Sequence, residues 1–144
     1  MSHRGYFGVA VYRPKHQVNI GTLFRTAHLL NASYLAVIGA RYKRQPSDTN
    51  NATYHMPLYE YGTWEDFLSH LPKGTRVVGV ELDVRAKVID DYKHPAQAVY
   101  VLGAEDDGLP PEVLNACDDI VRLRGARSMN VAVAGSIVLY SRGA

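Results

Sequence analysis

Residues 6–40, YFGVAVYRPKHQVNIGTLFRTAHLLNASYLAVIGA, decide the fold class of this chain. The runs at 6–12 and 33–40 are apolar throughout and have the length of buried strands. Between them, residues 19–31 carry apolar side chains at helical spacing, and Asn19 is well suited to cap that helix. Two apolar strands separated by a helix predict parallel strands in a sheet that is covered on both faces.

The same alternation of strands and helices continues to the end of the chain. We expect further strands at 76–82, 98–105 and 119–124. We expect helices at 63–71, with Thr63 as the cap, from Pro111, and at 130–142. Residues 41–62 are polar and rich in turn formers, so we expect a long surface loop there. The predicted fold is one α/β domain over 1–144, with a mostly parallel sheet and helices on both faces.

Composition narrows the class of protein. The 144 residues are 47% hydrophobic and 21% charged, which is typical of a globular domain with a core. The formal net charge of +2 permits an anionic partner without requiring one. A single cysteine, Cys117, excludes an internal disulfide, and we interpret it as a small buried residue of a cytoplasmic protein. No membrane segment is expected, because the longest apolar run, 131–140, is too short to span a bilayer.

Several common kinds of site lack their sequence signal. No glycine-rich dinucleotide motif follows a strand, and neither a Walker-type phosphate loop nor a Gly-x-Ser-x-Gly elbow occurs. The six histidines show no metal-ligand spacing, so no metal is predicted.

The last predicted helix, 130–142, is apolar on all sides. Such a helix must be buried on all sides, and a chain of this size has little else to surround it. Two arrangements satisfy the pattern: a second chain covers the helix in a dimer, or the helix lies at the centre of one chain. We favour the dimer.

Polar loops follow the predicted strands at the edge of the sheet where ligands bind in parallel α/β folds. Three notable motifs lie in or beside these loops: NIGTLFRTA at 19–27, LGAEDDGL at 102–109 and SMNVAVA at 128–134. Each motif alone has an ordinary interpretation. The first suits a helix cap with a surface arginine, the second an acidic turn or a cation site, and the third the helix cap that ends a basic loop.

Together and in this order, the three motifs resemble those of the SpoU/TrmH family of SPOUT RNA methyltransferases, above all its minimal tRNA-modifying members. The resemblance covers nearly the whole chain. It implies a C-terminal trefoil knot over roughly 99–144 and a homodimer through the knot and the last helix. It also implies transfer of a methyl group from S-adenosylmethionine to a ribose 2′-hydroxyl of RNA, with tRNA as the preferred substrate.

The same resemblance assigns site residues. It implies cofactor-binding roles for Glu81, Leu82, Gly103, Glu105, Gly108, Leu123, Ser128 and Met129. It implies catalytic roles for Arg25, Asn19, Glu105, Ser128 and Asn130. Within that set, Arg25 would orient the hydroxyl and the neighbouring phosphate, and Asn19 would position Arg25.

RNA requires a positively charged approach surface. The expected RNA-binding residues are Arg13, Lys15, Arg25, Arg124 and Arg127, and further cations occur at 41, 43, 44 and 122. Tyrosines at 42, 54, 59 and 61 suit either stacking on unpaired bases or covering the sheet edge. Two other functions stay open: an RNA-binding module without turnover, and a SPOUT enzyme that methylates a base.

Overall fold

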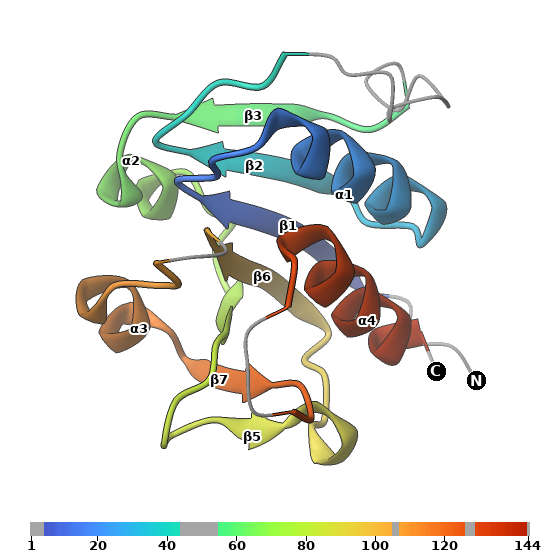
Figure 1. The fold of residues 1–144 in the computed structure, drawn as a ribbon, viewed down its shortest axis with the longest axis vertical. Coiled ribbons are helices and arrows are strands. Elements are labelled where there is room, and N and C mark those ends of the chain that lie inside the picture. The colour runs from blue at the N-terminus through green and yellow to red at the C-terminus, as the bar shows by residue number, and fades with distance from the viewer. Residues whose placement is uncertain (1–4, 44–54, 105–106, 126–128, 144) are drawn as a thin grey trace.

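The computed structural model describes residues 5–43, 55–104, 107–125 and 129–143 (Figure 1). The strands are β1 (Tyr6–Tyr12), β2 (Tyr34–Ile38), β3 (Leu58–Tyr61), β4 (Arg76–Val80), β5 (Lys87–Val88), β6 (Gln97–Gly103) and β7 (Asp119–Arg122). The helices are α1 (Gln17–Leu29), α2 (Trp64–Ser69), α3 (Pro111–Ala116) and α4 (Val131–Gly143), with a 3-10 turn, η2, at Ile89–Asp91. The predicted alternation of strands and helices is confirmed.

The strands form one sheet in the order β3-β2-β1-β6-β4-β7-β5, and within the described chain every strand pairing is parallel. The predicted α/β class is therefore correct. Tyr12, the last residue of β1, pairs with Ile38 of β2 and with Gly103 of β6. The carboxyl ends of these three neighbouring strands thus form one row, as the sequence argument required.

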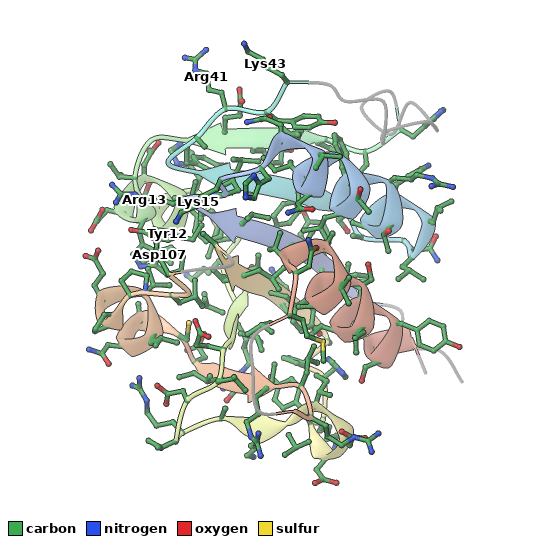
Figure 2. All side chains as sticks on the ribbon, in the orientation of Figure 1. Tyr12, Arg13, Lys15, Arg41, Lys43 and Asp107 are labelled. Carbon is green, nitrogen blue, oxygen red and sulfur yellow. The ribbon has the colours of Figure 1, made fainter. Side chains whose placement is uncertain are left out.

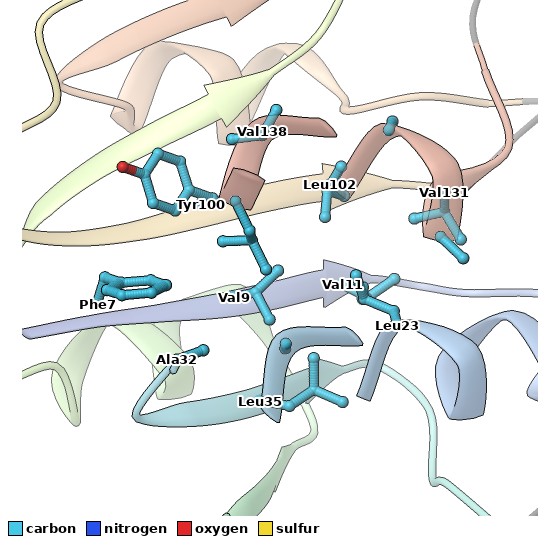
Figure 3. Close-up of a cluster of buried hydrophobic side chains, with 14 of the residues drawn as sticks. Phe7, Val9, Val11, Leu23, Ala32, Leu35, Tyr100, Leu102, Val131 and Val138 are labelled. Atoms are coloured by element: carbon cyan, nitrogen blue, oxygen red, sulfur yellow. The ribbon is translucent and has the colours of Figure 1, made fainter. Parts of the chain in front are cut away.

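Helices cover both faces of the sheet. Helices α1 and α4 lie side by side on one face, and α2 and α3 lie on the other (Figure 1). The first face holds the larger core, in which Val9, Leu23 and Val138 are fully buried (Figure 3). A Cβ atom at Gly135 of α4 would lie 2.5 Å from Leu23 Cδ1, so the glycine is what lets the two helices approach closely.

Two local predictions are confirmed at the start of helices. Thr63 caps α2, because its Oγ1 accepts a hydrogen bond from the Asp66 N–H at 3.1 Å. Pro111 is the first residue of α3, a position where the missing N–H has no cost. Cys117 ends α3 and is half-buried; its thiol donates to the Val113 carbonyl oxygen at 3.2 Å.

The predicted start of the first helix is wrong. Helix α1 begins at Gln17, with His16 as its N-cap residue and no side-chain capping bond. Asn19 lies inside the first turn, where its N–H donates to the His16 carbonyl oxygen at 3.2 Å. Its side chain is engaged in a tertiary hydrogen bond, described below, and this explains why Asn19 does not act as a cap.

The sequence analysis did not predict two of the strands. Residues 41–62 were expected to be a loop, but Leu58–Tyr61 form β3, which pairs with β2 at the edge of the sheet. Its polar composition reflects that edge position, where two of its four side chains are exposed. Strand β5 has only two residues and therefore no periodicity to detect. Residues 44–54 of the expected loop lie outside the described part of the chain.

The last helix is not surrounded within one chain, so a central position for it is excluded. Val133, Ile137 and Tyr140 are 49%, 40% and 70% exposed along one side of α4. The sequence also gave no sign that Arg142 would be buried. Its guanidinium donates to the carbonyl oxygens of Pro95 at 2.6 Å and Ala96 at 3.1 Å, which ties the end of α4 to the start of β6.

Candidate active site

A cavity lies at the carboxyl ends of β4, β6 and β7, where the structure brings together loops that are distant in sequence. Its inner space is about 60 Å³, and about 510 Å³ when the open mouth is included. The lining includes six residues of the predicted cofactor set: Glu81, Leu82, Gly103, Gly108, Leu123 and Met129. The other two members of that set, Glu105 and Ser128, lie outside the described residues.

Two glycines allow the walls of this cavity to approach each other. A Cβ atom at Gly103 would lie 2.4 Å from the Gly108 carbonyl carbon. Gly108 has a φ of +63°, and a Cβ atom there would lie 2.3 Å from Glu81 Oε2. Side chains would therefore fill the space at both positions, and backbone atoms form this part of the wall.

Glu81 joins the loop after β4 to the loop after β6. One carboxylate oxygen accepts a hydrogen bond from the Leu109 N–H at 2.6 Å, and the other accepts from the Leu82 N–H at 3.1 Å. Each oxygen retains acceptor capacity, because a carboxylate can accept about four hydrogen bonds. The sequence identified Glu81 as a ligand residue, but its role as a link between loops depends on tertiary structure.

Asn130 and Asn19 bring the third and first motifs together. Asn130 Oδ1 accepts hydrogen bonds from the N–H groups of Ala132 at 2.8 Å and Val133 at 3.3 Å, so Asn130 caps α4. This fixes which end of the amide is oxygen, and Nδ2 then donates to Asn19 Oδ1 at 3.1 Å. The beginnings of α1 and α4 are thereby held against each other.

Arg25 is exposed on α1 and is not among the residues that line the cavity of its own chain. Its neighbour Thr26 lines a second, shallower groove, which also includes Ile137 and Tyr140 of α4. The structure does not bring Arg25 into the site within one chain.

The predicted RNA-binding residues lie on two different sides of the cavity. Arg13 and Lys15 follow β1, and Lys15 Nζ lies 3.2 Å from Asp107 Oδ2 on the loop after β6 (Figure 2). Arg124 follows β7 and forms an exposed ion pair with Asp90 at 3.0 Å. Arg127 falls outside the described residues.

The sequence analysis missed several residues of the cavity. These are Val80, Leu102, Ala104, Arg122, Val131 and Ala134. Each lies within four residues of a predicted site residue, so the signal was their position at a strand end or helix start and not their side-chain chemistry. The residues that the structure describes include no group of three His, Cys, Asp or Glu side chains arranged to hold a metal ion. In the same part of the chain, no helix is long and apolar enough to cross a membrane.

Known proteins with similar sequence or structure are methyltransferases. The chain is 26% identical over 133 residues to an "Uncharacterized tRNA/rRNA methyltransferase" of Archaeoglobus fulgidus, which covers 87% of this chain and 58% of that protein. It is 27% identical to the tRNA (guanosine(18)-2′-O)-methyltransferase of Saccharomyces cerevisiae, over 85% of this chain and 9% of the yeast protein.

Among solved structures, the AdoMet-bound rRNA methyltransferase of Sinorhizobium meliloti matches with a TM-score of 0.84 and 25% identity, over 96% of this chain and 56% of that one. The chain spans less than two thirds of the length of each of these three relatives. The family model described as the SpoU rRNA Methylase family matches residues 6–140, and the chain belongs to that family.

Proposed function

We propose that this chain is an S-adenosylmethionine-dependent methyltransferase that modifies a ribose 2′-hydroxyl of RNA, with tRNA as the substrate. The observation that carries the proposal is the cavity in which six residues from four separate segments meet at the carboxyl ends of parallel strands. Family membership supports the reaction class. The yeast relative, a tRNA 2′-O-methyltransferase, supports tRNA and the ribose position.

The residues of the cavity fit S-adenosylmethionine. Backbone groups around Gly103 and Gly108 offer hydrogen bonds to an adenine edge, and Leu82, Leu123 and Met129 offer apolar contact to its faces. The inner space of about 60 Å³ is too small for a ligand of nucleoside size, so such a ligand must also occupy the mouth. Glu105 and Ser128, which flank these walls in sequence, are proposed to complete the set.

In the proposed reaction, the cofactor supplies a methyl group that its positively charged sulfur makes electrophilic. The residues of the chain must then orient a ribose hydroxyl toward that methyl group and offset the negative charge of the neighbouring phosphate. Accurate alignment alone can lower a reaction barrier by several kcal/mol. The hydrogen bond between Asn130 and Asn19 holds the first turns of α4 and α1 together beside the site.

Arg25 is proposed to orient the 2′-hydroxyl and bind the adjacent phosphate. A guanidinium remains protonated at all ordinary pH values, so Arg25 is suited to hydrogen bonding and not to accepting a proton. Its planar fork matches two phosphate oxygens at once.

We infer further that two chains form a homodimer through α4 and the groove beside it. The exposed strip of Val133, Ile137 and Tyr140 supports this, because an apolar helix side that faces water is costly. The groove that this strip borders continues to Thr26, next to Arg25. A partner chain packed in this groove would lie close to Arg25. In such a dimer Arg25 would serve the cavity of the partner chain, although it does not line the cavity of its own chain.

The C-terminal trefoil knot, over roughly 99–144 of a single domain, is also part of the proposal. Strand β4 lies between β6 and β7, so the segment from β4 to β6 makes a wide loop beside the path from β7 to α4. That arrangement supports threading of the last segment. Since the proposed substrate is tRNA, we place the enzyme in the cytoplasm.

The test is incubation of the purified protein with methyl-labelled S-adenosylmethionine and total tRNA or total rRNA, followed by digestion to nucleosides. Label in a 2′-O-methylnucleoside from tRNA is the expected result. Label on a base would instead identify a base methyltransferase. RNA binding without label in either pool would identify a binding module.

A further inference from the structure

We propose that Arg13, Lys15, Arg41 and Lys43 form one phosphate-binding track for RNA, named here the basic rim, and that Gln17 and Gly39 are its positioning residues. Arg13 and Lys15 follow the carboxyl end of β1, and Arg41 and Lys43 lie on the segment that follows β2 (Figure 2). None of the four is among the residues that line the cavity. The identity of the ligand as RNA rests on the proposed function. The arrangement of the four cations rests on contacts in this chain alone.

Arg13 is held in an unusual backbone conformation. Its φ of 49° lies in the left-handed region, which is unfavourable for a residue with a side chain. The Arg13 N–H donates to the Ile38 carbonyl oxygen at 2.8 Å, so the strained residue is tied to the end of β2. Strain of this kind persists where the surrounding contacts dictate it, and it is found most often at functional positions.

Gly39 makes room for the Arg13 side chain. A Cβ atom at Gly39 would lie 2.9 Å from Arg13 Cγ, and the glycine itself has a φ of +78°. On the other side, the guanidinium carbon lies 5.9 Å from the centre of the Tyr12 ring. The arginine stem therefore crosses Gly39 while its charged end remains exposed at the rim.

Gln17 fastens the second pair of cations. Its Nε2 donates to the Arg41 carbonyl oxygen at 2.8 Å, and its Oε1 accepts from the Lys43 N–H at 2.8 Å. Glu60 of β3 accepts from the Tyr42 N–H between them, also at 2.8 Å. Three consecutive residues after β2 are thus bound to the first residue of α1 and to the edge strand, and the side chains of Arg41 and Lys43 are exposed.

The basic rim begins one strand away from the cavity. Arg13 directly follows Tyr12, which pairs with Gly103 of the cavity wall, and neighbouring strands are about 4.8 Å apart. Lys15 reaches in the same direction, toward Asp107 on the loop that carries Gly108. A nucleotide whose ribose lies at the cavity would therefore place its flanking phosphates over the rim.

The charges favour a polyanion. Asp107 approaches Lys15, and Glu60 accepts a hydrogen bond from the Tyr42 N–H, whereas the first turn of α1 has no acidic residue. The four cations come from two loops whose backbones are held by the hydrogen bonds described above. Cations spread in this way suit the repeated phosphates of a nucleic-acid strand better than they suit one compact anion. Contacts of this type position RNA without reading its sequence.

Equilibrium binding of fluorescent bulk tRNA over a range of salt concentrations tests the track. We expect each of four single substitutions to reduce the magnitude of the slope of log affinity against log salt concentration by about 1. These are Arg13→Ala, Lys15→Ala, Arg41→Ala and Lys43→Ala. Lys73→Ala is the matched control, because Lys73 is exposed and precedes the amino end of β4. Its slope is expected to equal that of the wild type.

The positioning residues have a test of their own. Gln17→Ala and Gly39→Ala remove no charge, yet each is expected to raise the Kd for bulk tRNA about two- to tenfold, because mobile side chains must be ordered on binding. Val18→Ala, the exposed neighbour of Gln17, should leave the Kd unchanged. Unchanged Kd values for both positioning variants would overturn their role, and unchanged salt slopes for the four cation variants would overturn the track.

Failure here is distinguishable from failure of the proposed function. If wild-type protein methylates tRNA but the rim variants bind it normally, the track is wrong and the enzyme assignment stands. If no methyl transfer occurs with any RNA but the rim variants lose salt-dependent binding, the track stands and the enzyme assignment fails.

Discussion

Asn130 Nδ2 donates a hydrogen bond to Asn19 Oδ1 at 3.1 Å, across 111 residues of sequence. The same Asn130 caps α4 through its Oδ1, so one side chain both starts the last helix and fastens it to the first. Helices α1 and α4 pack against each other along the larger core. This hydrogen bond holds their first turns together at the end that faces the cavity.

Two substitutions at Asn130 should separate these roles. Asn130→Ala removes the cap and is expected to lower the free energy of unfolding by about 1 kcal/mol, measured by urea denaturation. Asn130→Asp keeps a capping oxygen but removes the donor to Asn19. It should retain stability while the methyl-transfer rate falls about three- to tenfold, the equivalent of one hydrogen bond. Wild-type rates in Asn130→Asp would show that the link to Asn19 has no part in the reaction.

Arg25→Ala should lower the methyl-transfer rate by at least about 100-fold, because the hydroxyl loses its alignment. Its affinity for S-adenosylmethionine, measured by calorimetry, should equal that of the wild type, since Arg25 is proposed to contact the RNA and not the cofactor. Arg25→Lys keeps the charge but lacks the planar fork, and should also be slow. Loss of cofactor affinity in either variant would contradict the assigned role.

Gly108→Ala should weaken cofactor binding about tenfold. The new Cβ atom would lie 2.3 Å from Glu81 Oε2 and would strain a backbone with a φ of +63°, so the wall must shift. Gly125→Ala is the matched control, because Gly125 also has a positive φ but no atom within 4 Å of the added Cβ. Equal cofactor Kd values for the two variants, measured by calorimetry, would mean that backbone strain alone explains the effect.

Ile137→Asp places a charge in the middle of the exposed strip on α4 and should convert a dimer into a monomer in sedimentation experiments. Methyl transfer should be lost at the same time if Arg25 acts on the partner's cavity. Val84→Asp is the control, because Val84 is fully exposed on another surface and should not affect assembly. A wild-type protein that sediments as a monomer at all concentrations would end the dimer proposal.

Cys117 should be a slow nucleophile at neutral pH. Burial disfavours the thiolate and raises the pKa of Cys117 from 9.0 to about 11. Alkylation by iodoacetamide at pH 8 should therefore be slow in the folded protein and fast in urea, with the folded rate rising toward pH 11. Because the unfolded chain loses its proton first, this thiol should also lower the stability of the fold as pH rises from about 9 to 11. Equal alkylation rates in both states would refute the burial effect.

The sequence by itself determined the α/β class, the parallel sheet and most element positions. Apolar runs such as 6–12 have the length of buried strands, and Thr63 and Pro111 act through local chemistry that depends on few neighbours. The family resemblance also named six residues that line one cavity in the structure. The predictions of strands and helices succeeded because each depends on periodicity or on capping.

Tertiary structure decided the rest. Asn19 resembles a cap by local chemistry, but its side chain bonds Asn130 instead, and no local pattern predicts a partner 111 residues away. Gln17 holds Arg41 and Lys43 through main-chain atoms that every residue possesses, so sequence carries no mark of that contact. Arg142 is buried because carbonyl oxygens of Pro95 and Ala96 meet its guanidinium after the chain has folded back. Local patterns specify elements, whereas the partners of long polar side chains depend on which segments the fold brings together.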